Sequence, residues 1–131
     1  MIISFAWTTS AFMAKRKTCT RRDWDDNYAL RWKKDSVHQA VNRQLRYGGK
    51  FIGKIRLTET PYKELTSNAP LSDYYAEGFD YLQLNGHKVN GMTPNELWVE
   101  WQCLNPVELW VVRFEILEVY SDNDSTALIE S

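Results

Sequence analysis

The longest strand candidate in the chain covers residues 107–119. Trp110, Val112, Phe114 and Ile116 fall on one face of this stretch, following the two-residue period of a β-strand. Its first half is apolar on both faces.

Three other segments have the pattern of strands. Residues 51–58 alternate between apolar and polar side chains, residues 37–42 form a shorter candidate, and residues 2–7 begin the chain with an apolar run. Residues 47–50, with the sequence YGGK, supply a turn, and Pro61 ends the strand before it or marks a sheet edge.

Short helices are predicted between the strands. Thr8, Thr9 and Ser10 offer N-cap oxygens to a helix over residues 11–14. Residues 23–34 place aspartates first and lysines last, as the helix dipole favours, and are predicted to be helical. Residues 62–92 are expected to hold one or two short helices that break at Gly78.

The clearest helix start in the sequence is at Thr93. Thr93 is the predicted N-cap, Pro94 takes the first helical position, and Glu96 closes a capping box. The expected buried stripe of this helix consists of Leu97, Trp101 and Leu104. About five strands with short helices between them favour an α+β fold, a small barrel or strongly bent sheet, over a doubly wound parallel sheet.

The composition describes an ordinary globular chain. With 131 residues, 44% apolar and 25% charged, we expect one domain over residues 1–120, followed by a flexible acidic tail over residues 121–131. The aromatic content of 14% suits a β-rich core and leaves some rings for stacking on a flat ligand.

Several classes of protein and of site do not fit the sequence. Cys19 and Cys103 match no metal-binding spacing, and His38 and His87 have no Cys or carboxylate neighbours at ligand spacing, so we expect neither a metal nor a cofactor. No run approaches the roughly 20 apolar residues of a membrane helix. The first residues lack the pattern of a signal peptide, and the two cysteines suit reduced thiols, so we expect a cytoplasmic protein.

A local cluster of cations stands out against a formal net charge of −1. Residues 15–22 read KRKTCTRR and hold five positive charges in eight positions. The near-neutral total argues against a histone-like binder of long polyanions, but a local basic patch can still hold a small nucleic-acid ligand. Cys19 lies among these cations, which would make it reactive if exposed, or it points into the core.

The order of the motifs resembles the ASCH family, whose small domains have the PUA-like barrel fold. The segments that carry the resemblance are ISFAWTTSAF, KRKTCTRR, KFIGKIRLTE, YYAEGF and WVVRFEILEV, and they run from about Ile2 to Val119. At Ala14-Lys15-Arg16 many members carry a glycine just before the Arg-Lys pair, and at residues 34–37 members usually have Gly-Asp. The segment 80–92 is an expected local elaboration.

The resemblance implies a cleft between the barrel and the helices that receives RNA or a nucleotide-like ligand. A bacterial branch of the family has amidohydrolase activity on acetylcytidine. Its essential Lys, Thr and Glu fall on Lys17, Thr20 and Glu77 of this chain. As an enzyme, the chain would use Thr20 as nucleophile, Lys17 as base and Glu77 as acid/base.

The same residues can instead bind a nucleotide-like ligand without catalysing a reaction. Lys17 and Arg21 would then pair with phosphate, Thr20 would bond to an oxygen, and Glu77 would accept from an amino group of a base. The full set of predicted ligand-binding residues is Trp7, Lys17, Thr18, Thr20, Arg21, Arg22 and Glu77. In the plainer interpretation, the basic stretch is a solvated surface, Glu77 forms an ordinary salt bridge, and Trp24 and Trp32 belong to the core.

We rank three functions. The first is a module that binds RNA or a modified nucleotide, the second is an amidohydrolase that deacetylates 4-acetylcytidine-like nucleosides, and the third is a protein adaptor with an aromatic surface.

Overall fold

The computed structural model describes residues 1–120, and the predicted tail over residues 121–131 lies outside them. The described strands are β1 (Ile2–Ser4), β2 (Cys19–Arg22), β3 (Val37–Val41), β4 (Phe51–Leu57), β5 (Tyr62–Leu65) and β6 (Glu108–Val119). The α-helices are α1 (Thr9–Met13), α2 (Asp26–Ala29), α3 (Ser72–Ala76), α4 (Phe79–Leu84) and α5 (Pro94–Val99). Shorter 3₁₀ turns are η1 (Ala6–Thr8), η2 (Leu45–Tyr47) and η3 (Thr66–Asn68), and a π-helical turn, η4 (Glu100–Leu104), continues α5.

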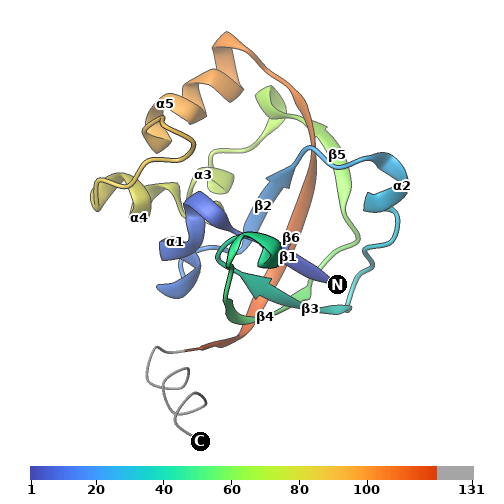
Figure 1. The fold of residues 1–131 in the computed structure, drawn as a ribbon. Coiled ribbons are helices and arrows are strands. Elements are labelled where there is room, and N and C mark those ends of the chain that lie inside the picture. Colours follow the sequence, from blue (N-terminus) through green and yellow to red (C-terminus); the bar gives the residue numbers. More distant parts are fainter. Residues whose placement is uncertain (121–131) are drawn as a thin grey trace, which may run out of the picture.

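All the described strands belong to one sheet, ordered β1-β3-β4-β6-β2, with β5 also paired to β6 (Figure 1). β1 runs parallel to β3, and the other pairs are antiparallel. The first part of β6 pairs with β5 and its later part with β4, while β2 lies along its other edge. The sheet therefore curls around β6 into a half-barrel, which confirms the predicted α+β class and the small barrel with short helices.

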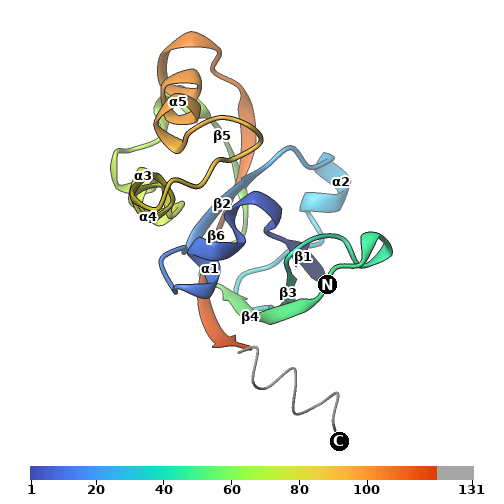
Figure 2. The ribbon, with the colours of Figure 1, turned by 60° about the vertical axis from the view of Figure 1, so that its left-hand side comes forward.

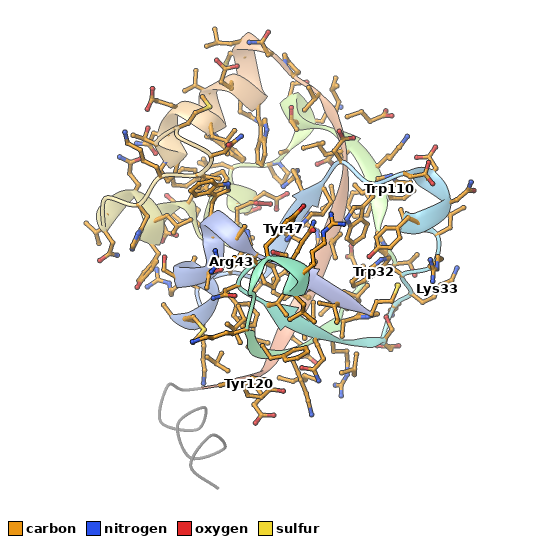
Figure 3. The ribbon with its side chains drawn as sticks, viewed as in Figure 1. Trp32, Lys33, Arg43, Tyr47, Trp110 and Tyr120 are labelled. Carbon is orange, nitrogen blue, oxygen red and sulfur yellow. The ribbon has the colours of Figure 1, made fainter. Side chains whose placement is uncertain are left out.

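The inside of the half-barrel is filled by aromatic and branched side chains. Its cluster contains Ile3, Phe5, Phe12, Trp32, Ala40, Ile52, Ile55, Leu57, Val112 and Phe114. Phe5 stacks on Phe12 at 4.8 Å between ring centroids, and Trp24 stacks on Trp32 at 4.7 Å. Trp32, labelled in Figure 3, is fully buried, so the expectation that it belongs to the core is confirmed, while Trp24 is half-buried and packs against that core.

A second, smaller core lies under the helices. α3, α4 and α5 gather on one side of the sheet in both ribbon views (Figures 1 and 2). Their cluster joins Ala11 of α1 to Phe79 and Leu82 of α4, with Trp98 and Trp101 packed against it. Because Phe12, the next residue of α1, belongs to the first core, α1 lies between the two cores.

Several predicted local features are confirmed. The chain breaks at Gly78 between α3 and α4, and Thr93 and Glu96 form the capping box that begins α5. Among the described helices, none is long and apolar enough to span a membrane.

Three local predictions were wrong. The helix expected over residues 23–34 is only Asp26–Ala29, because the chain then turns to bury Trp32 in the half-barrel. The hydroxyl of Thr8 does not cap α1 but donates to the carbonyl of Phe5 at 2.9 Å. Leu104 is 62% exposed rather than part of a buried stripe, because η4 leaves the α-helical register.

Candidate functional site

The basic stretch divides between surface and interior as the chain leaves α1 and enters β2. Lys15 and Arg16 are exposed, and Arg16 pairs with Asp80 at 3.0 Å. Lys17 and Arg21 are buried, and Arg22 is half-buried. The plainer interpretation, a solvated basic surface, therefore does not hold for these three cations.

Lys17 is held inside by Glu77. Its Nζ donates to the backbone carbonyl of Glu77 at 2.9 Å and lies 3.4 Å from the carboxylate oxygen Oε2 of the same residue. Lys17 is 0% and Glu77 3% exposed. Burial lowers the pKa of the Lys17 amine below its ordinary value, and the Glu77 charge opposes that shift only in part.

Gly78 brings Glu77 to this position. Gly78 has φ +81°, and a Cβ built on it would lie 2.6 Å from the Cβ of Ala11. The absence of a side chain therefore lets the end of α3 touch α1 and the segment before β2. The amide of Thr18 donates to the carbonyl of Ala76 at 2.8 Å, which fixes Lys17 opposite Glu77.

Arg21 is surrounded by carboxylates. Its Nη2 lies 2.6 Å from Asp73 and 2.8 Å from Glu64, and Arg113 bonds to both oxygens of Asp73 at 2.9 Å. Burial raises the pKa of Asp73, but the hydrogen bonds from Arg113 and Arg21 outweigh it and hold that pKa below its ordinary value. Arg21 is thus engaged within the protein, which leaves it little capacity for the predicted phosphate contact.

The sequence reasoning missed Asp73, Glu64 and Arg113. One available signal is the spacing of Asp73 and Glu77, because residues four apart share a helix face. Both acids end up buried against cations of the basic stretch, Asp73 from within α3 against Arg21 and Glu77 as its C-cap against Lys17.

Thr20 and Arg22 form a separate contact. The Nε of Arg22 donates to the Oγ1 of Thr20 at 3.1 Å, and the guanidinium lies over the ring of Phe5 at 5.5 Å from its centroid. Burial lowers the pKa of Arg22 to about 10, so it stays charged at neutral pH. Within residues 1–120 no hydrogen bond joins Thr20 to Lys17 or Glu77.

These residues line one pocket of about 200 Å³ between the two cores, named here the inner pocket. Six of the seven predicted ligand-binding residues line it: Trp7, Lys17, Thr20, Arg21, Arg22 and Glu77. Thr18 does not line it and is exposed. Trp7 is 61% exposed, so much of its ring faces solvent.

Glu77 brings an unsatisfied acceptor to the inner pocket. Its Oε1 is buried and has no hydrogen-bond partner among the described residues, since the nearest guanidinium nitrogen, Nη1 of Arg21, is 3.9 Å away. A buried carboxylate oxygen without a donor is costly, so a ligand that offers an N–H group there would be stabilised.

Cys19 is a core residue. It is 0% exposed, and burial raises its pKa to about 12, so the thiol is protonated at neutral pH and, of the two alternatives for Cys19, the one in which it points into the core is confirmed. Within residues 1–120 no three His, Cys, Asp or Glu side chains are placed to hold a metal ion.

Comparison of the chain with protein-family models, with curated proteins and with solved structures finds no match.

Proposed function

We propose that the inner pocket binds the base of a nucleotide, as a free nucleotide or as part of RNA. The observation that carries the proposal is the meeting of a buried ammonium, a buried carboxylate with one unpaired oxygen, and an exposed tryptophan at one pocket. A base has a flat face for Trp7 and polar edges for Lys17 and Glu77. The pocket is small, so it suits a single splayed base rather than a duplex.

Membership of the ASCH family is part of this proposal. Lys15 adopts φ +60° at the position where the family motif has glycine, which is the residue that occupies this region without strain. The turn at Lys15 thus keeps a glycine-like backbone although its side chain differs.

The hydrogen-bond pattern at Glu77 leads to a preference between bases. A carboxylate accepts from the amino group of cytosine, whereas the corresponding oxygen of uracil would repel it. We expect cytidine to bind about tenfold or more tighter than uridine, since a good base contact discriminates by ~1–3 kcal/mol. Isothermal titration of the two nucleosides measures this preference.

The matched variant is Glu77→Gln, which keeps the size of the side chain. It should reduce the preference to within about twofold, because the amide can both donate and accept. Equal affinity of the intact protein for cytidine and uridine, or no affinity for either, would contradict the proposal.

The second candidate is amide hydrolysis of an acetylated cytidine. It is favoured by the lowered pKa of Lys17 beside Glu77, because a desolvated amine can accept a proton. The oxygen of Thr20 would attack the acetyl carbon, Lys17 would take the hydroxyl proton, and a proton delivered from the Lys17–Glu77 pair would leave with the amine of cytidine. Water would then release acetate from Thr20.

In this mechanism Thr20 has to turn toward Lys17, since its oxygen accepts from Arg22 in the structure. Incubation with N4-acetylcytidine, followed by chromatography of the cytidine formed, tests the activity. We expect turnover that Thr20→Val abolishes while the folded state is retained by circular dichroism. Cytidine formation at the rate of the Thr20→Val variant would refute this second candidate.

A further inference from the structure

We infer that a second subsite lies beside the inner pocket and that each of the two holds one nucleotide. Arg22, which lines both, binds the phosphodiester that joins these nucleotides. The inference rests on the proposed function, because it takes the inner pocket as the place of one base. It adds a second ligand site and names the smallest full ligand as a dinucleotide unit of single-stranded RNA.

The second subsite is a pocket of about 440 Å³, named here the side pocket. It is lined by residues of β1, by Arg22, by Trp24 and Tyr28, and by the η2 segment that includes Leu45 and Arg46. Ser4 and Arg22 line the side pocket and the inner pocket alike, so the two pockets are neighbours with a shared wall. Figure 3 shows Tyr47 and Arg43 on the same connection between β3 and β4.

Arg22 has the properties of an anion site that the residues of the described part, 1–120, leave unfilled. Within residues 1–120 no carboxylate lies within 4 Å of its nitrogens, whereas Arg21 on the same strand and Arg113 on the neighbouring β6 are both paired. The hydrogen bond from Arg22 to Thr20 uses Nε, which leaves the two terminal nitrogens for the fork-like contact that guanidinium makes with phosphate.

The charges around the side pocket favour the same occupant. Arg22 and Arg46 line it, and no Asp or Glu of residues 1–120 does. Among the described residues, Glu77 is the one carboxylate that lines the inner pocket, and it is already paired with Lys17. An anionic group is therefore attracted to Arg22, which lines both pockets, and not to the part of the inner pocket that contains Glu77.

The lining of the side pocket suits a second nucleoside. Trp24 and Tyr28 provide aromatic surface, Leu45 is 42% exposed, and Gln44 and Ser4 supply polar groups at the rim. Stacking of a base on such rings tolerates any base, so we expect recognition in the inner pocket and sequence-independent affinity in the side pocket.

The test compares cytidine with the dinucleotide CpC, which carries one phosphodiester, by isothermal titration over a range of salt concentrations. We expect CpC to bind at least about tenfold tighter than cytidine, as a hydrogen-bonded charge pair allows. The affinity of CpC should fall with salt at a logarithmic slope of about −0.7, and that of cytidine should stay flat.

Arg22→Gln removes the charge, and because Arg22 lines both pockets, we expect it to weaken CpC about tenfold more than it weakens cytidine. Arg56→Gln is the matched control, because Arg56 is an exposed arginine that lines neither pocket, and it should change neither affinity. Leu45→Glu is an independent variant on the exposed η2 turn, where loss of folding is not expected, and it should weaken CpC but not cytidine.

The outcomes separate this inference from the proposed function. If cytidine binds and CpC binds no tighter, the second subsite is refuted and the base pocket stands. If Arg22→Gln weakens cytidine and CpC equally, Arg22 acts through Thr20 and not on a phosphate, which also refutes the inference. If neither probe binds, the proposed function itself fails and the subsite fails with it.

Discussion

At the scale of single residues, the eight-residue basic stretch performs three different tasks. Arg16 remains at the surface, Lys17 and Arg21 neutralise buried acids, and Arg22 alone among the last four cations lacks a carboxylate partner within residues 1–120. Buried charges without partners are strongly destabilising, so Lys17 and Arg21 depend on acids from α3, its C-cap and β5.

We expect Lys17→Met to lower the free energy of unfolding by about 3–5 kcal/mol, because it leaves Glu77 buried without its counterion. The double variant Lys17→Met/Glu77→Gln should be more stable than the single one, since it removes both charges. Urea unfolding of the four proteins of this cycle measures the coupling between the two residues. Additive effects would show that the 3.4 Å contact contributes no net coupling.

The sequence motif predicted Lys17, Thr20, Arg21, Arg22, Glu77 and Trp7 at the site, and these residues do line one pocket. It did not predict that Arg21 is committed to Asp73 and Glu64, because ion pairs between distant segments leave no periodic signal. Thr18, the seventh predicted residue, does not line this pocket.

At the scale of elements, the site depends on how closely α3 approaches α1. Gly78 permits this contact and needs a positive φ, whereas Gly86 also has a positive φ of +71° but no atoms within 4 Å of the place that a Cβ would take. The two glycines therefore form a natural pair for separating backbone strain from steric overlap.

Gly78→Ala is expected to destabilise the protein by about 2–4 kcal/mol, as the sum of left-handed strain and overpacking. Gly86→Ala should cost only the strain, about 1 kcal/mol. Thermal unfolding gives both values, and cytidine titration shows whether the Gly78 variant also loses the pocket. Equal destabilisation by the two substitutions would mean that the contact with Ala11 does not position Glu77.

Element prediction succeeded where one strong pattern decided the structure. The alternation over residues 51–58 and the capping box at Thr93 both gave the right element. β5 was missed because Tyr62–Leu65 has no apolar face and is a strand only through its pairing with β6. The helix over residues 23–34 was predicted too long. The order of aspartates and lysines along the helix dipole stabilises a helix less than the burial of the Trp32 side chain stabilises the observed turn.

At the scale of the whole molecule, stability is linked to pH through His38. His38 is 6% exposed, lies against Trp32 at 4.1 Å between ring centroids, and contacts Ser36 at 2.6 Å. Burial, followed by the charge of the nearby N-terminal amine, lowers its pKa to about 4. The unfolded chain therefore binds a proton at a higher pH than the folded protein does.

Between its unfolded pKa near 6.5 and its folded pKa near 4, stability must fall as the pH falls. We expect His38 to account for a loss of about 3 kcal/mol between neutral pH and about pH 4. His38→Gln, which has no titrating group, should show a correspondingly smaller loss. Urea unfolding at both pH values measures this, and parallel pH dependences of the two proteins would contradict it.

The central place of β6 has a consequence for synthesis on the ribosome. β6 borders β2, β4 and β5, yet it follows all of them along the chain. The half-barrel cannot close until β6 has left the exit tunnel, and until then the apolar side chains of the earlier strands stay uncovered. Translation speed over the final codons of the described region and chaperone binding to the nascent chain therefore bear directly on the yield of native protein.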